Sequence, residues 1–310
     1  MDAQPGDSIM VDIIMRTKDR PLLLERALDD VIAQSYTSWG LTVVNDGGEP
    51  DVVDALVAER ADRSGGRIRV IHNPASRGME AAANQAVRSS SGRWIAVHDD
   101  DDTWASSFLE RTVAWLTAHD ESPAVAVRTE IVWEQISENV VTELSREVFL
   151  PDIDQITLAQ LIRFNACVPI SLLYRRASLE EVGLFDESLE VVGDWECNLR
   201  LAAQGPFGFL DDRPLAYWHQ RPSVRGALGN SVIDRRDDHR RADRSVRDRE
   251  LRDSVVRDGA GVPLYLTRYL DDRFDELHRR LDRIEHDMHS SFPARLERAV
   301  RRVLRRGGSR

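Results

Sequence analysis

The sequence predicts a doubly wound, mostly parallel α/β sheet flanked by helices, with a helical C-terminal extension. Over residues 8–120, short apolar runs alternate with segments whose apolar residues recur at helical spacing, as is typical of parallel sheets. Some apolar runs end at polar turns, such as Asn45-Asp46-Gly47-Gly48. Beyond about residue 230 the chain becomes dense in arginine and aspartate. We therefore divide it into a body, residues 1–230, and a charged helical tail, residues 231–310.

The first half of the body contains four expected strands separated by helices. The strands are expected at residues 11–15, 41–44, 67–72 and 94–97, and the helices at 21–34, 51–62 and 80–89. The first helix has Pro21 in its first turn and apolar residues at helical spacing. Because ligands of open α/β sheets bind at the carboxyl ends of the strands, we expect a site at that edge.

The pattern is looser in the second half of the body. Strands are expected at 125–133 and 170–174, and helices at 157–164, 178–182 and 194–203. The segment 234–257 has few apolar positions, so we expect a solvated helix or a linker there.

The composition excludes several classes of protein. The net charge is −11, and residues 1–230 carry 21 basic and 37 acidic side chains, which argues against nucleic acid as the main partner. No stretch approaches the roughly 20 apolar residues of a membrane span, and the acidic N-terminus lacks a signal-peptide pattern. The two cysteines, Cys167 and Cys197, form neither a metal-type spacing nor a disulfide framework. We therefore expect a cytoplasmic protein.

The tail contains two further patterns, one apolar and one basic. Within 266–290, a short heptad seam is formed by Leu270, Phe274, Leu277, Leu281, Ile284 and Met288. The seam suits a homo-oligomer and suits equally well a helix packed on the body. After an expected break at Pro293, residues 294–306 place apolar side chains on one face with arginines around it. That pattern is typical of a peripheral contact with an anionic membrane at the inner face of the cell, or of an ordinary exposed helix.

Four consecutive aspartates, Asp99 to Asp102, follow directly after the apolar run 94–97. Neighbouring carboxylates repel one another, so crowding them at a strand end does not stabilise a fold. Mn²⁺ and Mg²⁺ bind carboxylate oxygens, so the run is a candidate site for such a cation. The alternative for the run taken alone is a solvated acidic loop. Asp102 is expected to turn away and cap a helix that begins near residues 103–106.

Four segments, in order, resemble family 2 glycosyltransferases. They are VDIIMRTKDR, TVVNDGG, SRGMEAAANQAVRSSSGRWIAVHDDDDTW and LYRRASLEEVGLFDESLEVVGDWECNLRLAAQG. The resemblance covers about residues 9–220 and leaves the tail unexplained. It implies the GT-A fold and a nucleotide-sugar donor.

The resemblance also implies donor-binding residues outside the aspartate run, namely Arg16, Thr17, Asp19, Asp46, Arg77 and Asn84. Asp46 matches the carboxylate that accepts a hydrogen bond from a pyrimidine ring N–H, although it could be a turn aspartate that caps the next segment. An arginine at position 77 could bind phosphate oxygens with two hydrogen bonds, or could lie on the surface.

The aspartate run matches the DxD-type motif of the family, with Asp99 and Asp101 in its first and last positions. The resemblance implies that Asp101 touches the metal, and that Asp100 or Asp99 holds the ribose or a metal-bound water. His219 matches a histidine that completes the metal site in some members, with a structural role as the alternative. An imidazole ligand suits Mn²⁺ better than Mg²⁺.

The segment Val192-Gly193-Asp194-Trp195-Glu196 matches one that usually reads Glu-Asp-Trp in this family. There the aspartate is the catalytic base, so the resemblance assigns Asp194 that role, which is compatible with its capping a helix. Gly193 stands where the family usually has an acid. Trp195 and Glu196 are expected to bind the acceptor, with a core position as the alternative for Trp195.

The aspartate run and the resemblance together indicate a metal-dependent glycosyltransferase of polysaccharide biosynthesis, and the resemblance implies that it inverts the configuration of the sugar. It would move a sugar from a nucleoside-diphosphate donor, with UDP or dTDP favoured, to a hydroxyl of a glycan or lipid-linked acceptor. One alternative is a nucleotidyltransferase, but the first turn, RTKDRP, lacks the glycine-rich loop of those enzymes. The other is a non-catalytic module that binds a sugar nucleotide or glycan and assembles through its C-terminal helices.

Overall fold

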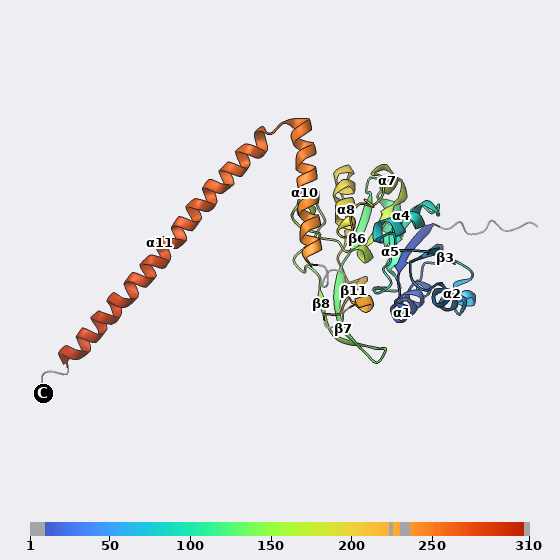
Figure 1. Cartoon of the computed structure of the whole chain (residues 1–310), viewed down its shortest axis with the longest axis horizontal. Helices are drawn as coiled ribbons and strands as arrows, with labels where there is room; N and C mark the ends of the chain where they lie inside the picture. Colours follow the sequence, from blue (N-terminus) through green and yellow to red (C-terminus); the bar gives the residue numbers. More distant parts are fainter. Residues whose placement is uncertain (1–9, 223–225, 230–235, 307–310) are drawn as a thin grey trace, which may run out of the picture. The chain divides into compact units, whose positions relative to one another are not determined.

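The computed structural model describes residues 10–222, 226–229 and 236–306 (Figure 1). The chain divides into two compact units, one up to Ser245 and one from Val246 onward. The division falls within helix α10 (Arg236–Asp258), and helix α11 (Gly261–Arg306) follows.

The first unit is built on a seven-stranded sheet that is mostly parallel. Its strands are β1 (Val11–Thr17), β2 (Trp39–Asp46), β3 (Ile68–Asn73), β4 (Trp94–Val97), β6 (Ala124–Val127), β9 (Leu172–Arg175) and β10 (Gly208–Leu210). They lie in the order β10-β6-β9-β4-β1-β2-β3, and β9 runs antiparallel to both of its neighbours. The predicted fold class is confirmed.

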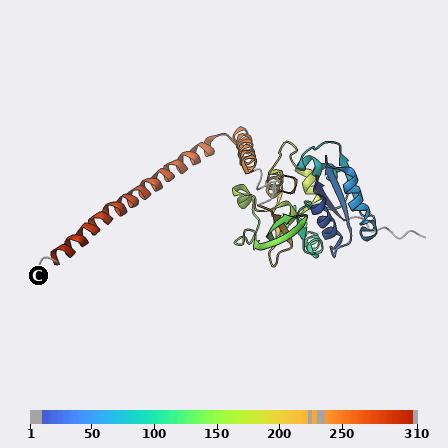
Figure 2. The same cartoon turned by 60° about the horizontal axis from the view of Figure 1, so that its bottom comes forward.

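Helices cover both faces of this sheet (Figure 2). They are α1 (Pro21–Ile32), α2 (Pro50–Ala58), α3 (Ala61–Ser64), α4 (Met79–Arg88), α5 (Phe108–Ala118), α6 (Leu158–Arg163), α7 (Arg176–Glu181) and α8 (Gly193–Gln204). Successive strand residues point to opposite faces, so Ile13 packs in the core beneath α1 and α5, and Ile14 in the core beneath α4 and α8. The helix predicted at 51–62 is divided into α2 and α3.

A second, four-stranded sheet has the order β5-β11-β7-β8. Its strands are β5 (Thr103–Trp104), β7 (Thr129–Ser137), β8 (Val140–Val148) and β11 (Ala216–Gln220). The single strand predicted at 125–133 is wrong, because the chain leaves the first sheet after β6 and enters the second at β7. Arg128 lies at this junction, where its N–H donates to the Leu210 carbonyl at 2.8 Å and its carbonyl accepts from Leu215 at 3.0 Å.

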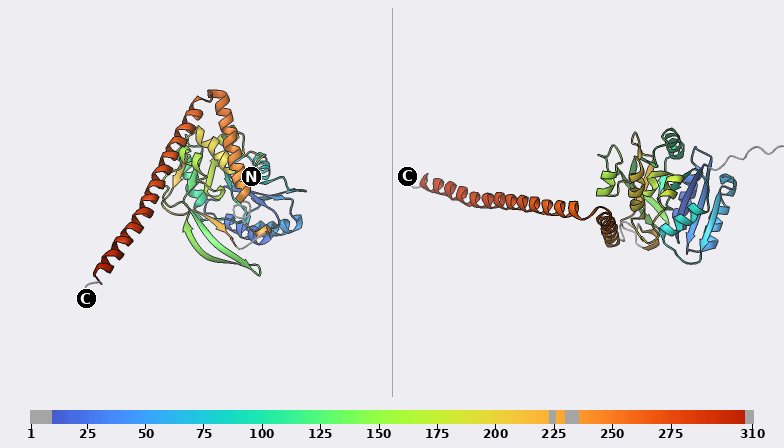
Figure 3. Two further views of the ribbon diagram at one scale, coloured as in Figure 1. Left: turned by 60° about the vertical axis from the view of Figure 1, so that its left-hand side comes forward. Right: turned by 90° about the horizontal axis from the view of Figure 1, so that it is seen from above.

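The hairpin of β7 and β8 was not predicted. Glu138 and Asn139 form its two-residue turn, with φ of 52° and 62°. Positive φ at both positions matches the twist of a tight hairpin, but only asparagine signals it in the sequence. The hairpin extends away from its neighbours in green in Figure 3 (left), and most of β8 is exposed.

Two predicted helix boundaries are also wrong. No helix begins at 103–106, since β5 pairs with β11 and α5 begins at Phe108. In the tail, α11 continues through Pro293 without a break. Proline removes one hydrogen bond of a helix, and the helix continues on both sides of it. The described part of the segment 234–257, from Arg236 onward, belongs to α10, as one of its two interpretations predicted.

Candidate active site

The predicted donor residues cluster where β1 and β4 end, because the two strands are parallel neighbours. Arg16 is the residue before the last in β1, and Asp99 follows β4 after a single histidine. The Arg16 guanidinium donates to Asp99 Oδ1 from Nε at 3.0 Å and also from Nη2. The structure therefore brings two predicted donor residues into a direct ion pair, 83 positions apart in the sequence.

Arginines also partner the next two aspartates. Arg20 Nη1 lies 3.1 Å from Asp100 Oδ1 and 3.5 Å from Asp101 Oδ2. Arg221, whose side chain is fully buried, pairs with Asp101 Oδ2 as well. These guanidinium groups offset the repulsion of the crowded carboxylates, which explains how the run is buried.

The Asp100 carboxylate is buried, and the described residues satisfy only part of it. Its Oδ2 is buried and has no hydrogen-bond partner among the described residues. Burial raises the pKa of Asp100 to about 6, although Arg20 and the Thr17 hydroxyl act to lower it. A buried carboxylate oxygen without a partner is costly, so this atom points to a ligand that binds there.

Asp102 does not cap a helix. Its buried carboxylate accepts the N–H of His219 at 2.8 Å, and burial beside Asp101 and Asp99 raises its pKa well above the ordinary range. It therefore joins the strand end of β4 to β11.

The His219 ring takes part in a buried network rather than in a cluster of metal ligands. Its Nδ1 lies 2.9 Å from Glu134 Oε2, and its Nε2 lies 2.8 Å from the Thr103 hydroxyl. Within the described part of the chain, no three histidine, cysteine, aspartate or glutamate side chains are arranged to hold one ion. His219, Asp99 and Asp101 are thus not brought together as predicted.

Glu134 on β7 is the centre of this network, and the sequence analysis missed it. Its carboxylate accepts from Arg26 Nη1 at 2.9 Å and from Arg221 Nη1 at 2.6 Å, in addition to His219. Burial acts to raise the pKa of Glu134, but hydrogen bonds from His219 and Arg26 lower it to about 2. The sequence feature that could have revealed Glu134 is its position two residues after Val132, because this spacing places both side chains on the same buried face of β7.

The Asp46 carboxylate is fully engaged by the chain itself. Its oxygens accept from Asn73 Nδ2 at 2.8 Å, the Ser76 hydroxyl at 2.7 Å, the Arg77 N–H at 2.9 Å and the Gly78 N–H at 3.1 Å. Burial opposes ionisation, but these hydrogen bonds, led by Arg77, hold the pKa of Asp46 below its usual range. Asp46 thus has the capping contacts of the alternative interpretation.

Asn84 has a structural role instead of the predicted one. Its amide nitrogen donates to the Phe185 carbonyl at 2.8 Å and to Glu187 Oε1 at 2.9 Å, and its oxygen accepts the Phe185 N–H at 3.1 Å. The side chain is 1% exposed, and its hydrogen bonds to Phe185 and Glu187 fix the loop before α8. The Arg77 side chain is exposed, and Asp19 accepts the Glu49 N–H at 3.3 Å.

Asp194 lies in the first turn of α8. Its Oδ2 accepts from Asn165 Nδ2 at 2.9 Å. Burial raises the pKa of Asp194, against the hydrogen bond from Asn165 and the charge of Arg16. Because Asp194 also acts on the pKa of Arg16, the predicted base and the donor residues share one electrostatic environment.

The two residues after Asp194 are both buried. Trp195 is 2% exposed, and its indole N–H donates to the Leu161 carbonyl at 2.7 Å. Glu196 is 4% exposed and pairs with Arg200 one turn later at 2.6 Å. These contacts agree with the core position that was the alternative for Trp195, and the two acceptor assignments stay predictions.

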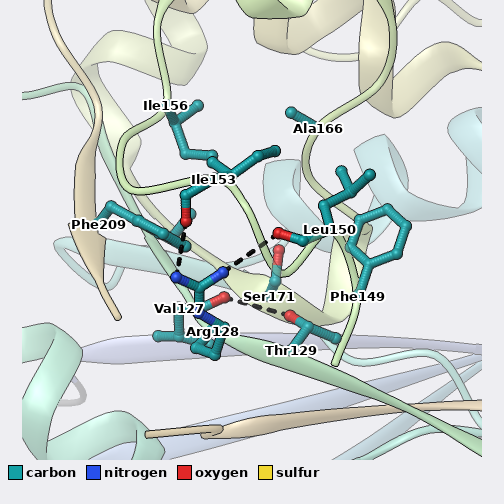
Figure 4. A pocket seen from close by; sticks show the side chains of 11 residues that line it. Val127, Arg128, Thr129, Phe149, Leu150, Ile153, Ile156, Ala166, Ser171 and Phe209 are labelled. Atoms are coloured by element: carbon teal, nitrogen blue, oxygen red, sulfur yellow. Dashed lines mark hydrogen bonds between the residues drawn. The ribbon is translucent and has the colours of Figure 1, made fainter. Parts of the chain in front are cut away.

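A small cavity elsewhere in the body contains none of the predicted site residues. It lies around Arg128, whose guanidinium donates to the carbonyls of Leu150 at 3.3 Å and Ile153 at 2.7 Å (Figure 4). These hydrogen bonds hold the loop after β8, so the cavity is part of the scaffold.

The family model described as glycosyl transferase family 2 matches residues 12–183, which include the paired Arg16 and Asp99. The chain belongs to this family. It is therefore a glycosyltransferase, and the nucleotidyltransferase alternative is wrong.

Curated relatives carry the same activity in their names. The uncharacterized glycosyltransferase YwdF of Bacillus subtilis is 29% identical over 193 residues, covering 62% of this chain and 68% of YwdF. The Escherichia coli UDP-Glc:alpha-D-GlcNAc-diphosphoundecaprenol beta-1,3-glucosyltransferase WfgD is 29% identical over 116 residues, covering 37% of this chain and 44% of WfgD. A PGL/p-HBAD biosynthesis glycosyltransferase of Mycobacterium tuberculosis is 25% identical over 227 residues, covering 73% of this chain and 81% of that protein.

Solved structures confirm the GT-A fold. S. aureus TarS 1–349 in complex with UDP has a TM-score of 0.52 and 18% identity, covering 69% of this chain and 61% of that one. The mannosyltransferase PcManGT from Pyrobaculum calidifontis, in complex with GDP-Man and Mn²⁺, has a TM-score of 0.52 and 20% identity, covering 73% and 61%. Among the described residues of our chain, no helix is both long and apolar enough to cross a membrane.

Proposed function

We propose that this glycosyltransferase transfers a sugar from a nucleoside-diphosphate donor to a hydroxyl of a glycan or lipid-linked acceptor, with inversion and with Asp194 as the general base. One observation carries the proposal. Asp194 follows Gly193, where an added Cβ would lie 2.4 Å from Glu80 Oε1, and Glu80 Oε2 lies 3.4 Å from Arg16 Nη1, which pairs with Asp99 at the end of β4. A base placed beside a donor site is the arrangement that a direct displacement needs.

In this mechanism Asp194 takes the proton from the acceptor hydroxyl as its oxygen attacks the anomeric carbon. Asn165 holds one carboxylate oxygen of Asp194 and fixes its orientation. A raised pKa makes the carboxylate a better proton acceptor near neutral pH. The bond between the anomeric carbon and the diphosphate breaks in the same step, so inversion follows from attack on the opposite side.

A divalent cation fits the aspartate run. Mg²⁺ and Mn²⁺ take oxygen ligands and are commonly held by one or two carboxylates together with substrate phosphates. Asp101, which the sequence selects, and Asp100, with its unsatisfied buried Oδ2, would hold the ion. Bound there, it would stabilise the negative charge that develops on the leaving diphosphate.

The donor base is proposed from the relatives. WfgD is named for UDP-Glc, and TarS was solved with UDP, so UDP is the first nucleotide to test, ahead of dTDP and GDP. The pyrimidine contact expected of Asp46 gives no support, because donors of the chain already fill its oxygens.

Two partners of the tail are also proposed. The seam residues Leu270, Phe274, Leu277, Leu281 and Ile284 are each about half exposed on α11 (50–58%), so a second copy of the chain could cover them as a coiled coil. Residues 294–306 continue the helix, and a peripheral membrane contact there rests on their sequence, since their side chains lie outside the described residues.

Calorimetric titration tests the donor site. UDP, dTDP and GDP are titrated with Mn²⁺ and with EDTA into the wild type, into Asp101→Ala, and into Asp120→Ala as a control with an exposed aspartate. We expect one nucleotide to bind only with Mn²⁺, and Asp101→Ala alone to lose that binding. Nucleotide binding that is unchanged by EDTA and by Asp101→Ala would overturn the metal assignment.

The base is tested with Asp194→Asn, which keeps the size of the side chain. Nucleotide binding should remain, while release of nucleotide from the sugar donor should fall by about 10²- to 10⁴-fold. Equal release by wild type and variant would reject Asp194 as the base. No release by either would favour the non-catalytic binding module.

A further inference from the structure

Glu80 and Gly193 occupy one space between α4 and α8. Glu80 lies in the first turn of α4 and is 5% exposed. A Cβ atom added at Gly193 would lie 2.4 Å from Glu80 Oε1 and 2.6 Å from Glu80 Cδ. Any side chain at position 193 would therefore force the Glu80 carboxylate to shift, so the two positions compete for one space.

Glu80 connects the donor residues with the helix that carries the base. On one side its Oε2 lies 3.4 Å from Arg16 Nη1, and Arg16 pairs with Asp99. On the other side its carboxylate accepts a hydrogen bond from the Gly193 backbone. Helix α8 has no side-chain cap of its own, so Glu80 provides a negative group at the N-terminus of α8.

Packing between α4 and α8 alone does not explain a carboxylate here. Arg16 is already paired with Asp99 through two nitrogens, and its contact with Glu80 is the longer one. Burial raises the pKa of Glu80 to about 7, and the charges of Asp194 and Asp99 raise it too, although Arg16 opposes them. An uncharged side chain would fill the space at lower energetic cost.

We propose that Glu80 provides, from α4, the acceptor-side carboxylate that position 193 lacks, and that it positions Asp194 and the attacking hydroxyl. This inference rests on the proposed function, with Asp194 as the base. Glu80 is a positioning residue, because it acts through α8 and Arg16. The carboxylate would thus come from a different helix, α4, and it lies against the residue directly before the base.

The test transfers the carboxylate from position 80 to position 193. Five forms are compared: the wild type, Glu80→Ala, Gly193→Glu, the double variant Glu80→Ala/Gly193→Glu, and the matched neutral control Glu80→Ala/Gly193→Gln. The readouts are the thermal midpoint and the release of nucleotide from UDP-glucose, dTDP-glucose and GDP-mannose without added acceptor, so that water takes the acceptor's place.

We expect Gly193→Glu alone to lower the midpoint by about 5 °C, because two side chains compete for one space, and the double variant to recover it. Glu80→Ala should reduce kcat by about 100-fold, and Glu80→Ala/Gly193→Glu should restore it to within about tenfold of the wild type. Glu80→Ala/Gly193→Gln should stay near Glu80→Ala, since it restores volume without charge.

Three results would overturn the inference: wild-type kcat for Glu80→Ala, equal rescue by the Gln and Glu double variants, or no recovery of the midpoint in the double variant. A wild type that neither binds any of the three sugar nucleotides in calorimetric titration nor releases nucleotide from them would refute the proposed function instead. In that case the midpoints still decide whether the two positions share one carboxylate.

Discussion

Replacing Glu80 by glutamine should remove a defined part of the pH dependence of stability. The glutamine keeps the shape of the side chain but cannot ionise. In the folded protein, burial raises the pKa of Glu80 from 4.5 to about 7, and the side chain is only 5% exposed, so solvent screens it little. With 1.36 kcal/mol for each pKa unit, the shift corresponds to about 3 kcal/mol of unfolding free energy.

The sign follows from proton binding. Between about pH 4.5 and pH 7 the folded state keeps the Glu80 proton while the unfolded state has lost it. The unfolded state therefore binds fewer protons, and the Glu80 contribution to stability falls as the pH rises through this range, then stays constant. In Glu80→Gln this decrease is absent. The unfolding free energy of the variant minus that of the wild type should therefore increase by about 3 kcal/mol as the pH rises from about 4.5 to 8.

Urea unfolding at half-unit pH intervals, followed by circular dichroism, measures the difference between the two curves. Other titrating groups are common to both proteins and cancel. A difference that does not change between about pH 4.5 and pH 8 would refute the raised pKa and the reasoning from burial. A difference that changes in the opposite direction would mean that the pairing with Arg16 outweighs burial.

Three further outcomes are expected. Asp46→Ala should destabilise the body by about 2 kcal/mol in urea unfolding, because the loop donors lose their acceptor, whereas a residue that only contacts the donor base would leave stability unchanged. Glu134→Gln should cost about 3 kcal/mol by leaving the buried Arg221 without one of its counterions, and the exposed Glu138→Gln should show no change in the same assay. If the α11 seam joins two copies, Leu277→Asp should abolish self-association in sedimentation experiments. Arg279→Ala, on the opposite face of α11, is the control. A wild type that sediments as a monomer at all concentrations would reject the seam as an interface.

The alternation of strands and helices was predictable because it depends on local patterns. Periodicity of two or of about 3.6, together with proline and turn residues, sets each element along β1 to β4. Parallel pairing then places the ends of β1 and β4 together, so Arg16 and Asp99 could be assigned to one site. The single strand expected at 125–133 failed where the chain changes sheets at Arg128, since nothing local marks which sheet a β-forming segment will join.

The sequence by itself therefore determined the fold class, the family resemblance, the edge of the sheet that holds the aspartates, and the position of Asp194 at the start of a helix. The tertiary structure alone decided which carboxylates and arginines meet. Glu134 and Arg221 reach the site from outside the four motif segments, and their contacts depend on the path of the whole backbone. Glu80 lies within one of those segments, but its closeness to Gly193 depends on how α4 and α8 pack. The directions of Asn84, Trp195 and Glu196 were likewise set by what packs over them, because a helical side chain near a site can equally face the core.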